Sequence, residues 1–405
     1  MKILHTSDWH IGRRLKNKDR LDEFIKFFDW LENLIARENI DILLVSGDIF
    51  DNTTPSVQAQ NIYYSFLYSI AKSQCKNCVI ISGNHDSPAF LDAPSDLLKL
   101  SNIHVVGRAS QNPDDEIIIL HDPDLIVCAV PYLRDRDVRA ANLNYSFQDI
   151  ENALRAGIIN HYEKIFYRAQ EIQQNFNAPI IAMGHLFVRG GRTNIDDGTR
   201  SLYVGTSVEI GSDLFSRDYI NYTALGHLHS PQFIKHENIK YSGSPIAMTF
   251  GESEITKSVS IIELDNNNLQ IQEIPVPVFQ KLEKISGGSD KIYSRLRTLA
   301  ENNESVWLDI TYTGNKLISE VKEVLQAFSK EFPLIEILSI HDESSRALSQ
   351  GKILNSFTQE LDEITPLEIL EMCFDENNIS EDDREIFTRL YQEILQEIHE
   401  KGGNN

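Results

Sequence analysis

The sequence predicts a mixed α/β sandwich, followed by a small α/β unit and a C-terminal pair of helices. Three observations lead to this fold class. Apolar strands alternate with amphipathic helices in the first third, further strands follow a long helix, and a proline-rich stretch opens a second regular series. Strands joined through helices are expected to be parallel and buried. The later strands resemble antiparallel ones, which favours a mixed sandwich over a doubly wound sheet.

The expected elements of the first third alternate strictly between strand and helix. They are a strand over Ile3–Ser7, a helix over Leu21–Arg37, a strand over Asp41–Ser46, a helix over Ser56–Ser73 and a strand over Cys78–Ser82.

The next elements begin with a hairpin around the turn His121–Asp124. Its strands are expected over Glu116–Leu120 and Leu125–Val130, and a long helix covers Gln148–Gln173. The remaining strands are expected at Pro179–Met183, Asn221–Leu225, Ser258–Leu264 and Gln270–Val276.

A domain boundary is predicted at Pro275–Val278, where two prolines interrupt a strand. Residues 1–276 would form the first domain and residues 277–345 a small α/β domain. The elements expected in the small domain are a helix over Ser289–Ala300, a strand over Ser305–Tyr312, a helix over Lys316–Ser329 and a strand over Leu334–His341.

Residues 346–405 are predicted to be a linker and two helices. Thr365 and Pro366 open the first helix as cap and first helical residue, and Ser380 opens the second. The second helix carries an apolar stripe of six residues: Phe387, Leu390, Tyr391, Ile394, Leu395 and Ile398.

The 405-residue chain carries a formal net charge of −22, which by itself argues against a nucleic-acid-binding protein. The charge is unevenly distributed, because residues 351–405 hold 4 basic and 14 acidic residues. The segment 11–20 is locally basic, with Arg13, Arg14, Lys16, Lys18 and Arg20 against one aspartate.

Four cysteines, a polar N-terminus and no long apolar run predict a cytoplasmic chain with no membrane contact.

Five short polar signatures each follow an expected strand. They are Asp8-Trp9-His10, Gly47-Asp48, Gly83-Asn84-His85-Asp86, Gly184-His185 and Gly226-His227-Leu228-His229. Catalytic groups of open α/β sheets gather beyond the carboxyl ends of strands, so these five tips can converge. Asp8 and His10 are two positions apart, as are His227 and His229. In extended chain, residues at this spacing point to the same side, so we expect the two side chains of each pair to point the same way. The glycines would let the backbone approach a crowded centre.

The residue types indicate a pair of divalent metal ions. Two aspartates, one asparagine and four histidines, with no thiolate, suit manganese, iron or zinc. Two such ions can polarise a phosphate and activate a bound water. Each signature alone is usually a turn, and only their joint order favours a catalytic site.

The order of these motifs is similar to that of the calcineurin-like metallophosphoesterases. The forms Ser7-Asp8-Trp9-His10-Ile11-Gly12-Arg13 and Gly47-Asp48-Ile49-Phe50-Asp51 resemble its branch of DNA double-strand-break repair nucleases. The resemblance covers essentially the whole chain. It implies a four-layer α/β/β/α sandwich, a small α/β capping domain that contacts DNA and a C-terminal helical pair.

The resemblance also implies the site residues. Asp8, His10, Asp48 and His229 would hold one metal ion. Asp48, Asn84, His185 and His227 would hold the other, with Asp48 as the bridge and manganese as the expected metal. His85 would act on the scissile phosphate, oriented by Asp86. Archaeal members carry a second substrate-side histidine where this chain has Asp51, so that role does not carry over.

Two interaction surfaces are expected. The basic residues Arg13, Arg14, Lys16, Lys18 and Arg20 could contact the DNA backbone, with Arg189 and Arg192 as weaker candidates, or they could form a solvated face. The stripe from Phe387 to Ile398 is expected to dock on a partner, and its alternative is packing within its own domain.

The resemblance implies an ATP-dependent 3′ to 5′ double-strand exonuclease that also cleaves single strands and hairpins. A coiled-coil ATPase would supply the ATP dependence, and two copies of this chain would form a homodimer within a heterotetramer associated with the nucleoid. Two alternatives stay open. One is a small-molecule phosphodiesterase or phosphoprotein phosphatase on the same fold, and the other is a non-catalytic DNA-end tether.

Overall fold

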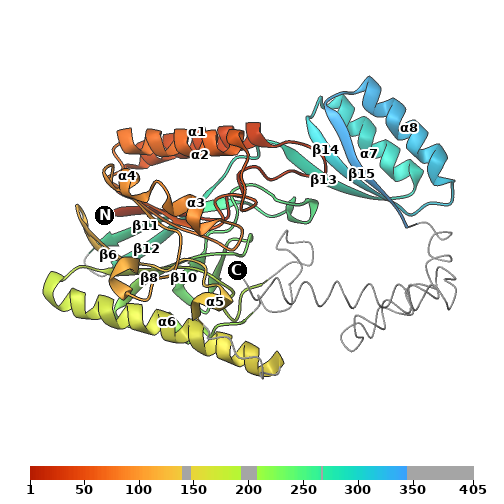
Figure 1. Cartoon of the computed structure of the whole chain (residues 1–405). Coiled ribbons are helices and arrows are strands. Elements are labelled where there is room, and N and C mark those ends of the chain that lie inside the picture. Colours follow the sequence, from red (N-terminus) through yellow and green to blue (C-terminus); the bar gives the residue numbers. More distant parts are fainter. Residues whose placement is uncertain (139–146, 193–207, 266–267, 344–405) are drawn as a thin grey trace.

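Two six-stranded sheets face each other in the centre of the larger domain, and a three-stranded sheet forms a small domain beside it (Figure 1). The computed structural model describes residues 1–138, 147–192, 208–265 and 268–343. Helices cover the outer face of each central sheet, α1 and α2 on one and α6 on the other. The predicted four-layer α/β/β/α fold is confirmed.

The first sheet has the strand order β12-β11-β1-β2-β3-β4. Its strands are β1 (Lys2–Thr6), β2 (Ile42–Ser46), β3 (Asn77–Ile81), β4 (Ile103–Val106), β11 (Ser258–Asp265) and β12 (Asn268–Pro275). The helices on this side are α1 (Leu21–Glu38), α2 (Val57–Lys72), α3 (Pro88–Asp92) and α4 (Ser95–Lys99). Strands β1 to β4 are parallel, whereas β11 runs antiparallel to β1 and to β12.

The second sheet has the order β5-β6-β7-β8-β10-β9. Its strands are β5 (Ile117–His121), β6 (Asp124–Ala129), β7 (Ile180–His185), β8 (Ile220–Gly226), β9 (Gln232–Ile234) and β10 (His236–Tyr241). Its helices are α5 (Asp135–Val138) and α6 (Phe147–Phe176), and short 3₁₀ turns occur at η1 (Pro113–Glu116), η2 (Ser212–Leu214) and η3 (Phe250–Glu252).

The expectation that the later strands are antiparallel is wrong for β7 and β8. Both run parallel to β6, because the chain crosses over through the 30-residue helix α6 before it enters β7. The predicted hairpin β5–β6 is antiparallel, and β11 and β12 also pair antiparallel, as expected of the later strands.

Strand β2 shows why a central strand carries a run of four apolar residues, Ile42–Val45. Leu43 and Val45 pack against α1 and α2, while Ile42 and Leu44 face the second sheet. All five residues of the strand are buried. A strand covered on both faces needs apolar side chains at every position rather than at alternate ones.

The small domain has its own sheet and its own core. It consists of β13 (Lys281–Gly287), α7 (Ser289–Glu301), β14 (Val306–Tyr312), α8 (Ile318–Glu331) and β15 (Ile335–Asp342). All three strands are parallel. The sequence did not predict β13. Val276 packs in the core of the first domain and Ile285 in that of the small domain, so the core changes between these two residues.

A separate apolar cluster joins the two domains. Leu15 and Phe250 of the large domain pack with Leu282 and Trp307 of the small one. Lys18 also forms an ion pair with Glu336 on β15. The basic segment that follows the first motif is therefore held against the small domain.

The predicted C-terminal linker and helical pair, with the stripe from Phe387 to Ile398, lie outside the described residues. Among the described helices, none is both long and apolar enough to cross a bilayer.

Leu308→Ala tests whether the small domain unfolds as a separate unit. Leu308 is fully buried in its core, so the substitution should destabilise it by about 2–5 kcal/mol. Calorimetry should show a lower transition temperature for the small domain and an unchanged one for the large domain. Leu334→Ala, at an exposed position of the same domain, is the control. Equal shifts of the whole unfolding profile would show one cooperative unit instead.

Candidate metal centre

The five polar signatures meet at one edge of the two central sheets. Asp8 and His10 follow β1, Asp48 follows β2, and Asn84 and His85 follow β3. His185 is the last residue of β7, and His227 and His229 follow β8. These strands are parallel within each sheet, so their carboxyl ends face the same space.

Four of the seven proposed ligands have left-handed backbone conformations. The φ angles are 52° at Asp8, 49° at His10, 51° at Asp48 and 100° at His227. Such values are uncommon outside glycine and are typical of functional sites whose surroundings over-determine the backbone. Asp8 and His10 therefore converge through the turn that follows the strand, and the prediction that strand alternation aligns them is wrong.

Backbone hydrogen bonds between neighbouring loops hold these turns in place. The amide of Asp8 donates to the carbonyl of Gly47 at 3.0 Å, and that of His10 to the carbonyl of Asp48 at 2.9 Å. Trp9 lies in the core of the first sheet, where its Nε1 donates to Thr6. The strained turns are thus fixed by main-chain hydrogen bonds, which leave the side chains of these residues available to the site.

The Asp48 carboxylate lies between two groups of donor atoms. Its Oδ2 is 3.4 Å from His10 Nε2 and also 3.4 Å from His185 Nε2. His10 Nε2 lies 3.2 Å from His229 Nε2, which completes the first group with Asp8. One oxygen of Asp48 therefore faces both groups.

Asn84 completes the second group. Its Oδ1 lies 3.0 Å from His185 Nε2 and 3.1 Å from His227 Nδ1. Asp48 thus lies between two pairs of histidines, His10 with His229 and His185 with His227. These are the same two groups that the resemblance implied.

Hydrogen bonds at the far ring nitrogens preset two histidines for metal binding. His185 Nδ1 lies 2.9 Å from the carbonyl of Ser46, which can only accept, so Nδ1 carries the hydrogen. His229 Nδ1 lies 3.1 Å from Glu252 Oε1 in the same way. In the neutral form of either ring, the Nε2 atom would carry a lone pair that points toward the centre. This donor set fits two divalent cations.

Glycines allow the two sheets to come this close. A Cβ on Gly226 would lie 1.8 Å from the carbonyl oxygen of Ser46, and one on Gly83 would lie 2.1 Å from Asp48 Oδ1. Any side chain at either position would push the loops apart. The predicted role of these glycines in a crowded centre is confirmed.

Burial and mutual charge shift the pKa values of the cluster. Burial raises the pKa of Asp48, but the adjacent His185 and His10 outweigh burial and leave it well below its ordinary value. Burial lowers the pKa of His185, yet the Asp48 carboxylate raises it to about 9. Burial and the charge of His185 lower the pKa of His227 to about 3. Because metal ligation requires neutral imidazoles, a cation would compete with the proton on His185.

Asp86 does not orient His85, so that prediction is wrong. The Asp86 carboxylate accepts hydrogen bonds from the backbone amides of Ile49, Phe50 and Gly83, at 3.1, 2.9 and 2.8 Å. It ties the loop after β2 to the loop after β3. A carboxylate saturated by three amides has a structural role in these loops rather than a role toward an imidazole.

Asp51 takes the place that was expected of Asp86. His85 Nδ1 lies 2.8 Å from the backbone carbonyl of Asp51, and the ring packs edge-on against His10 with 4.8 Å between centroids. Since a carbonyl only accepts, His85 Nδ1 donates the hydrogen bond to Asp51. The Asp51 carboxylate pairs with Arg13 at 2.9 Å.

The predicted basic surface is only partly accessible. Arg14 and Lys16 are exposed, and Lys18 is half-buried in its pair with Glu336. Arg20 is 2% exposed and bonds to Glu23 and the carbonyl of Ala247, so it cannot reach a DNA backbone and is removed from the predicted set. Arg20 is buried where it pairs with Glu23 of α1. The spacing of the basic residues in the sequence could not show this burial.

The two weaker candidates lie on the loop after β7. Arg189 is exposed and pairs with Glu209 at 3.2 Å, and Arg192 is exposed at the end of the described segment.

Sequence reasoning missed Glu252 and Lys257. Glu252 is fully buried, contacts His229 as described and pairs with Lys257 at 2.5 Å. No spacing signal links a glutamate 23 positions downstream to a histidine motif, because η3 brings it back through the tertiary fold.

Comparisons with known proteins place the chain in a family. The family model of the calcineurin-like phosphoesterases matches residues 1–231, and that of the type 5 capsule protein repressor C-terminal domain matches residues 278–378. The chain is 29% identical to the SbcD subunit of the SbcCD nuclease of Escherichia coli K12, over 98% of both chains. It is 32% identical to the protein of that name from Bacillus subtilis, over 81% of this chain and 83% of the relative.

Asp86→Asn should destabilise the protein even without metal. An amide offers one acceptor oxygen in place of two, so at least one buried backbone amide loses its partner, at a cost of about 1–3 kcal/mol. Urea unfolding of the metal-free protein measures this, with the exposed Asp96→Asn as control. Unchanged stability combined with lost activity would restore Asp86 to a role toward His85.

Proposed function

The chain belongs to the calcineurin-like phosphoesterase family, and from that premise we propose that it is a metal-dependent nuclease of the SbcD type. The single observation that carries the proposal is Asp48, one of whose oxygens faces two groups of nitrogen and oxygen donors. Such a shared carboxylate is the feature that a two-metal hydrolytic site requires.

Two divalent cations complete the proposed site. Asp8, His10, Asp48 and His229 would hold one ion, and Asp48, Asn84, His185 and His227 the other. When bound, the ions would polarise a phosphodiester and lower the pKa of a water. Divalent metal is supported by the donor set, and manganese is the more specific proposal because carboxylate and amide oxygens accompany the imidazoles.

His85 is proposed to act on the phosphate rather than on a metal. Its Nδ1 is committed to the Asp51 carbonyl, which fixes the ring and leaves Nε2 to stabilise the transition state or protonate the leaving oxygen. The ring is 7% exposed, so it can be reached from the solvent side while most of it is shielded.

DNA is the proposed substrate. Two carboxylates against two dications leave a positive surplus that suits a phosphodiester. Arg14 and Lys16 are exposed beyond His10, Arg13 and Lys18 lie beside them, and Arg189 and Arg192 extend the set. Contacts of this kind position a nucleic acid through its phosphates and carry no sequence preference.

The relatives' names indicate a complex, and we propose an SbcC-type coiled-coil ATPase as the partner. With it the chain would act as an ATP-dependent 3′ to 5′ double-strand exonuclease and a single-strand and hairpin endonuclease. The further proposals are a homodimer within a heterotetramer and a cytoplasmic, nucleoid-associated location. Residues 277–345 are proposed as the capping domain and residues 346–405 as the docking segment.

Two substitutions test the proposed chemistry on hairpin DNA with Mn²⁺. Asp48→Ala should abolish cleavage and weaken both metal sites, because it removes the shared carboxylate.

His85→Ala should bind two metals and DNA normally while losing about 10²–10⁴ in rate.

The outcomes separate the alternatives. Loss of a metal in His85→Ala would place His85 among the ligands and contradict its proposed role. Wild-type protein that hydrolyses a small phosphodiester or a phosphoprotein but not DNA would favour the small-substrate alternative. DNA binding without any cleavage would favour the tether.

Removal of residues 365–405 tests the docking segment. The segment has excess negative charge and an apolar stripe, so it suits a protein surface better than DNA. The shortened chain should keep Mn²⁺-dependent single-strand cleavage and lose association with the ATPase in size-exclusion chromatography. Charged substitutions at Leu390 and Ile394 should have the same effect. Full co-elution of the shortened chain would place docking elsewhere.

A further inference from the structure

Helix η3 brings a buried carboxylate against a proposed metal ligand. Glu252 is fully buried, and its Oε1 lies 3.1 Å from His229 Nδ1. On the opposite side of the ring, His229 Nε2 lies 3.2 Å from His10 Nε2. Glu252 therefore touches the ring at the atom that faces away from the centre, where a carboxylate fixes both the rotation and the tautomer of a ligand histidine.

The second oxygen of Glu252 is held by a buried lysine. Lys257 Nζ is 2.5 Å from Glu252 Oε2, and the amide of Met248 donates to the same oxygen at 3.0 Å. Lys257 Nζ also donates to the backbone carbonyl of His229 at 3.0 Å. The Glu252–Lys257 pair is thus hydrogen-bonded to His229 both at its ring and at its backbone carbonyl. Because the two charges cancel, the pair adds no net charge beside the cations.

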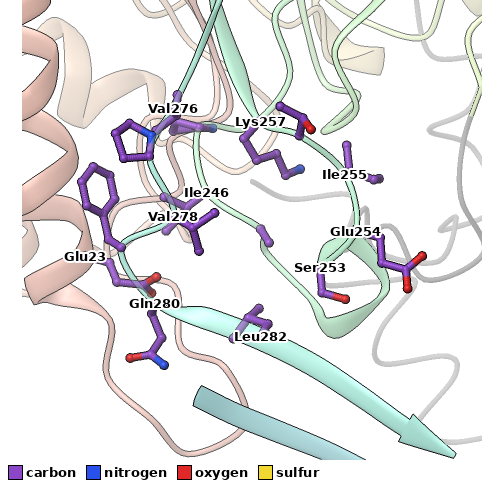
Figure 2. A pocket seen from close by; sticks show the side chains of 15 residues that line it. Glu23, Ile246, Ser253, Glu254, Ile255, Lys257, Val276, Val278, Gln280 and Leu282 are labelled. Carbon is purple, nitrogen blue, oxygen red and sulfur yellow. The ribbon is translucent and has the colours of Figure 1, made fainter. Parts of the chain in front are cut away.

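η3 contacts the small domain. Phe250, at the start of η3, packs with Leu282 and Trp307 in the cluster between the domains. Beyond η3, the loop with Ser253 and Glu254 and the linker that leads to β13 line a pocket of about 180 Å³ (Figure 2). Phe250 is the residue of η3 that enters this cluster, so it provides an apolar anchor for the turn.

We propose that Glu252 is a positioning residue for the metal ligand His229, that Lys257 holds Glu252 in place, and that the small domain steadies the pair through Phe250. The inference rests on the proposed metal centre. It predicts a selective effect, because the pair holds His229 at its ring and its backbone, and His229 belongs to the proposed ligands of one ion only.

The experiment is calorimetric titration of the metal-free full-length chain with Mn²⁺. The wild type should bind two ions. Glu252→Gln keeps the size of the side chain and removes its charge, so one ion should bind about 10–100-fold more weakly while the other is unchanged. Glu254→Gln, exposed and two positions away, is the matched control and should behave as the wild type. The visible spectrum with Co²⁺ should change in Glu252→Gln alone.

Each outcome decides one point. Wild-type protein that binds no Mn²⁺ contradicts the proposed function, whereas two ions with unchanged affinities and Co²⁺ spectrum in Glu252→Gln contradict only the role of Glu252. If Glu252→Gln lowers the affinity for both Mn²⁺ ions equally, Glu252 has a general structural role, and this result also overturns the proposal.

Two further variants complete the test. Glu252→Asp keeps the charge but withdraws the carboxylate from His229, and if Glu252→Gln does not fold, this variant must show the same selective loss. Phe250→Ala should lower the affinity for the same Mn²⁺ ion, but by a smaller factor than Glu252→Gln. Unchanged Mn²⁺ binding in Phe250→Ala removes the small domain from the proposal.

Discussion

The close approach of β2 and β8 at their carboxyl ends is the constraint on which the candidate centre depends. At this point the backbone of Gly226 lies against the carbonyl of Ser46, with no room for a Cβ. The same carbonyl accepts from His185 and so orients a ligand of the second sheet. Any increase in the distance between the sheets would separate Asp48 from His185, since the two residues come from opposite sheets.

The cluster is costly for the chain without metal. Several carboxylates and imidazoles are buried together, and four of the proposed ligands sit on left-handed backbone. Desolvation opposes their charged forms, and strained turns oppose folding. What offsets these costs is outside the donor set: amide-to-carbonyl bonds between loops and the three amides that Asp86 satisfies. A centre built in this way is preorganised, because its support does not rely on the cations.

The small domain is connected to the centre through two short segments. Leu15, a few residues after His10, and Phe250, two residues before Glu252, both enter the apolar cluster with Trp307. The first segment carries the basic residues and the second carries the carboxylate beside His229. A domain that adjoins a nuclease site through these two segments is placed to affect both substrate contacts and metal geometry.

The sequence by itself determined the central strands and helices, the sandwich class and the residues that gather at the centre. Uninterrupted apolar runs such as Ile42–Val45 and polar tips such as Gly83–Asp86 are local signals, so they can be read without the fold. The sequence could not show which side chains contact one another across loops that are far apart in the chain. Only the tertiary structure decided that Asp51 rather than Asp86 orients His85, that Arg20 is buried, and that Glu252 lies behind His229. Each of these depends on loops and turns whose paths are fixed by packing between segments far apart in the chain, and sequence spacing carries no information about such packing.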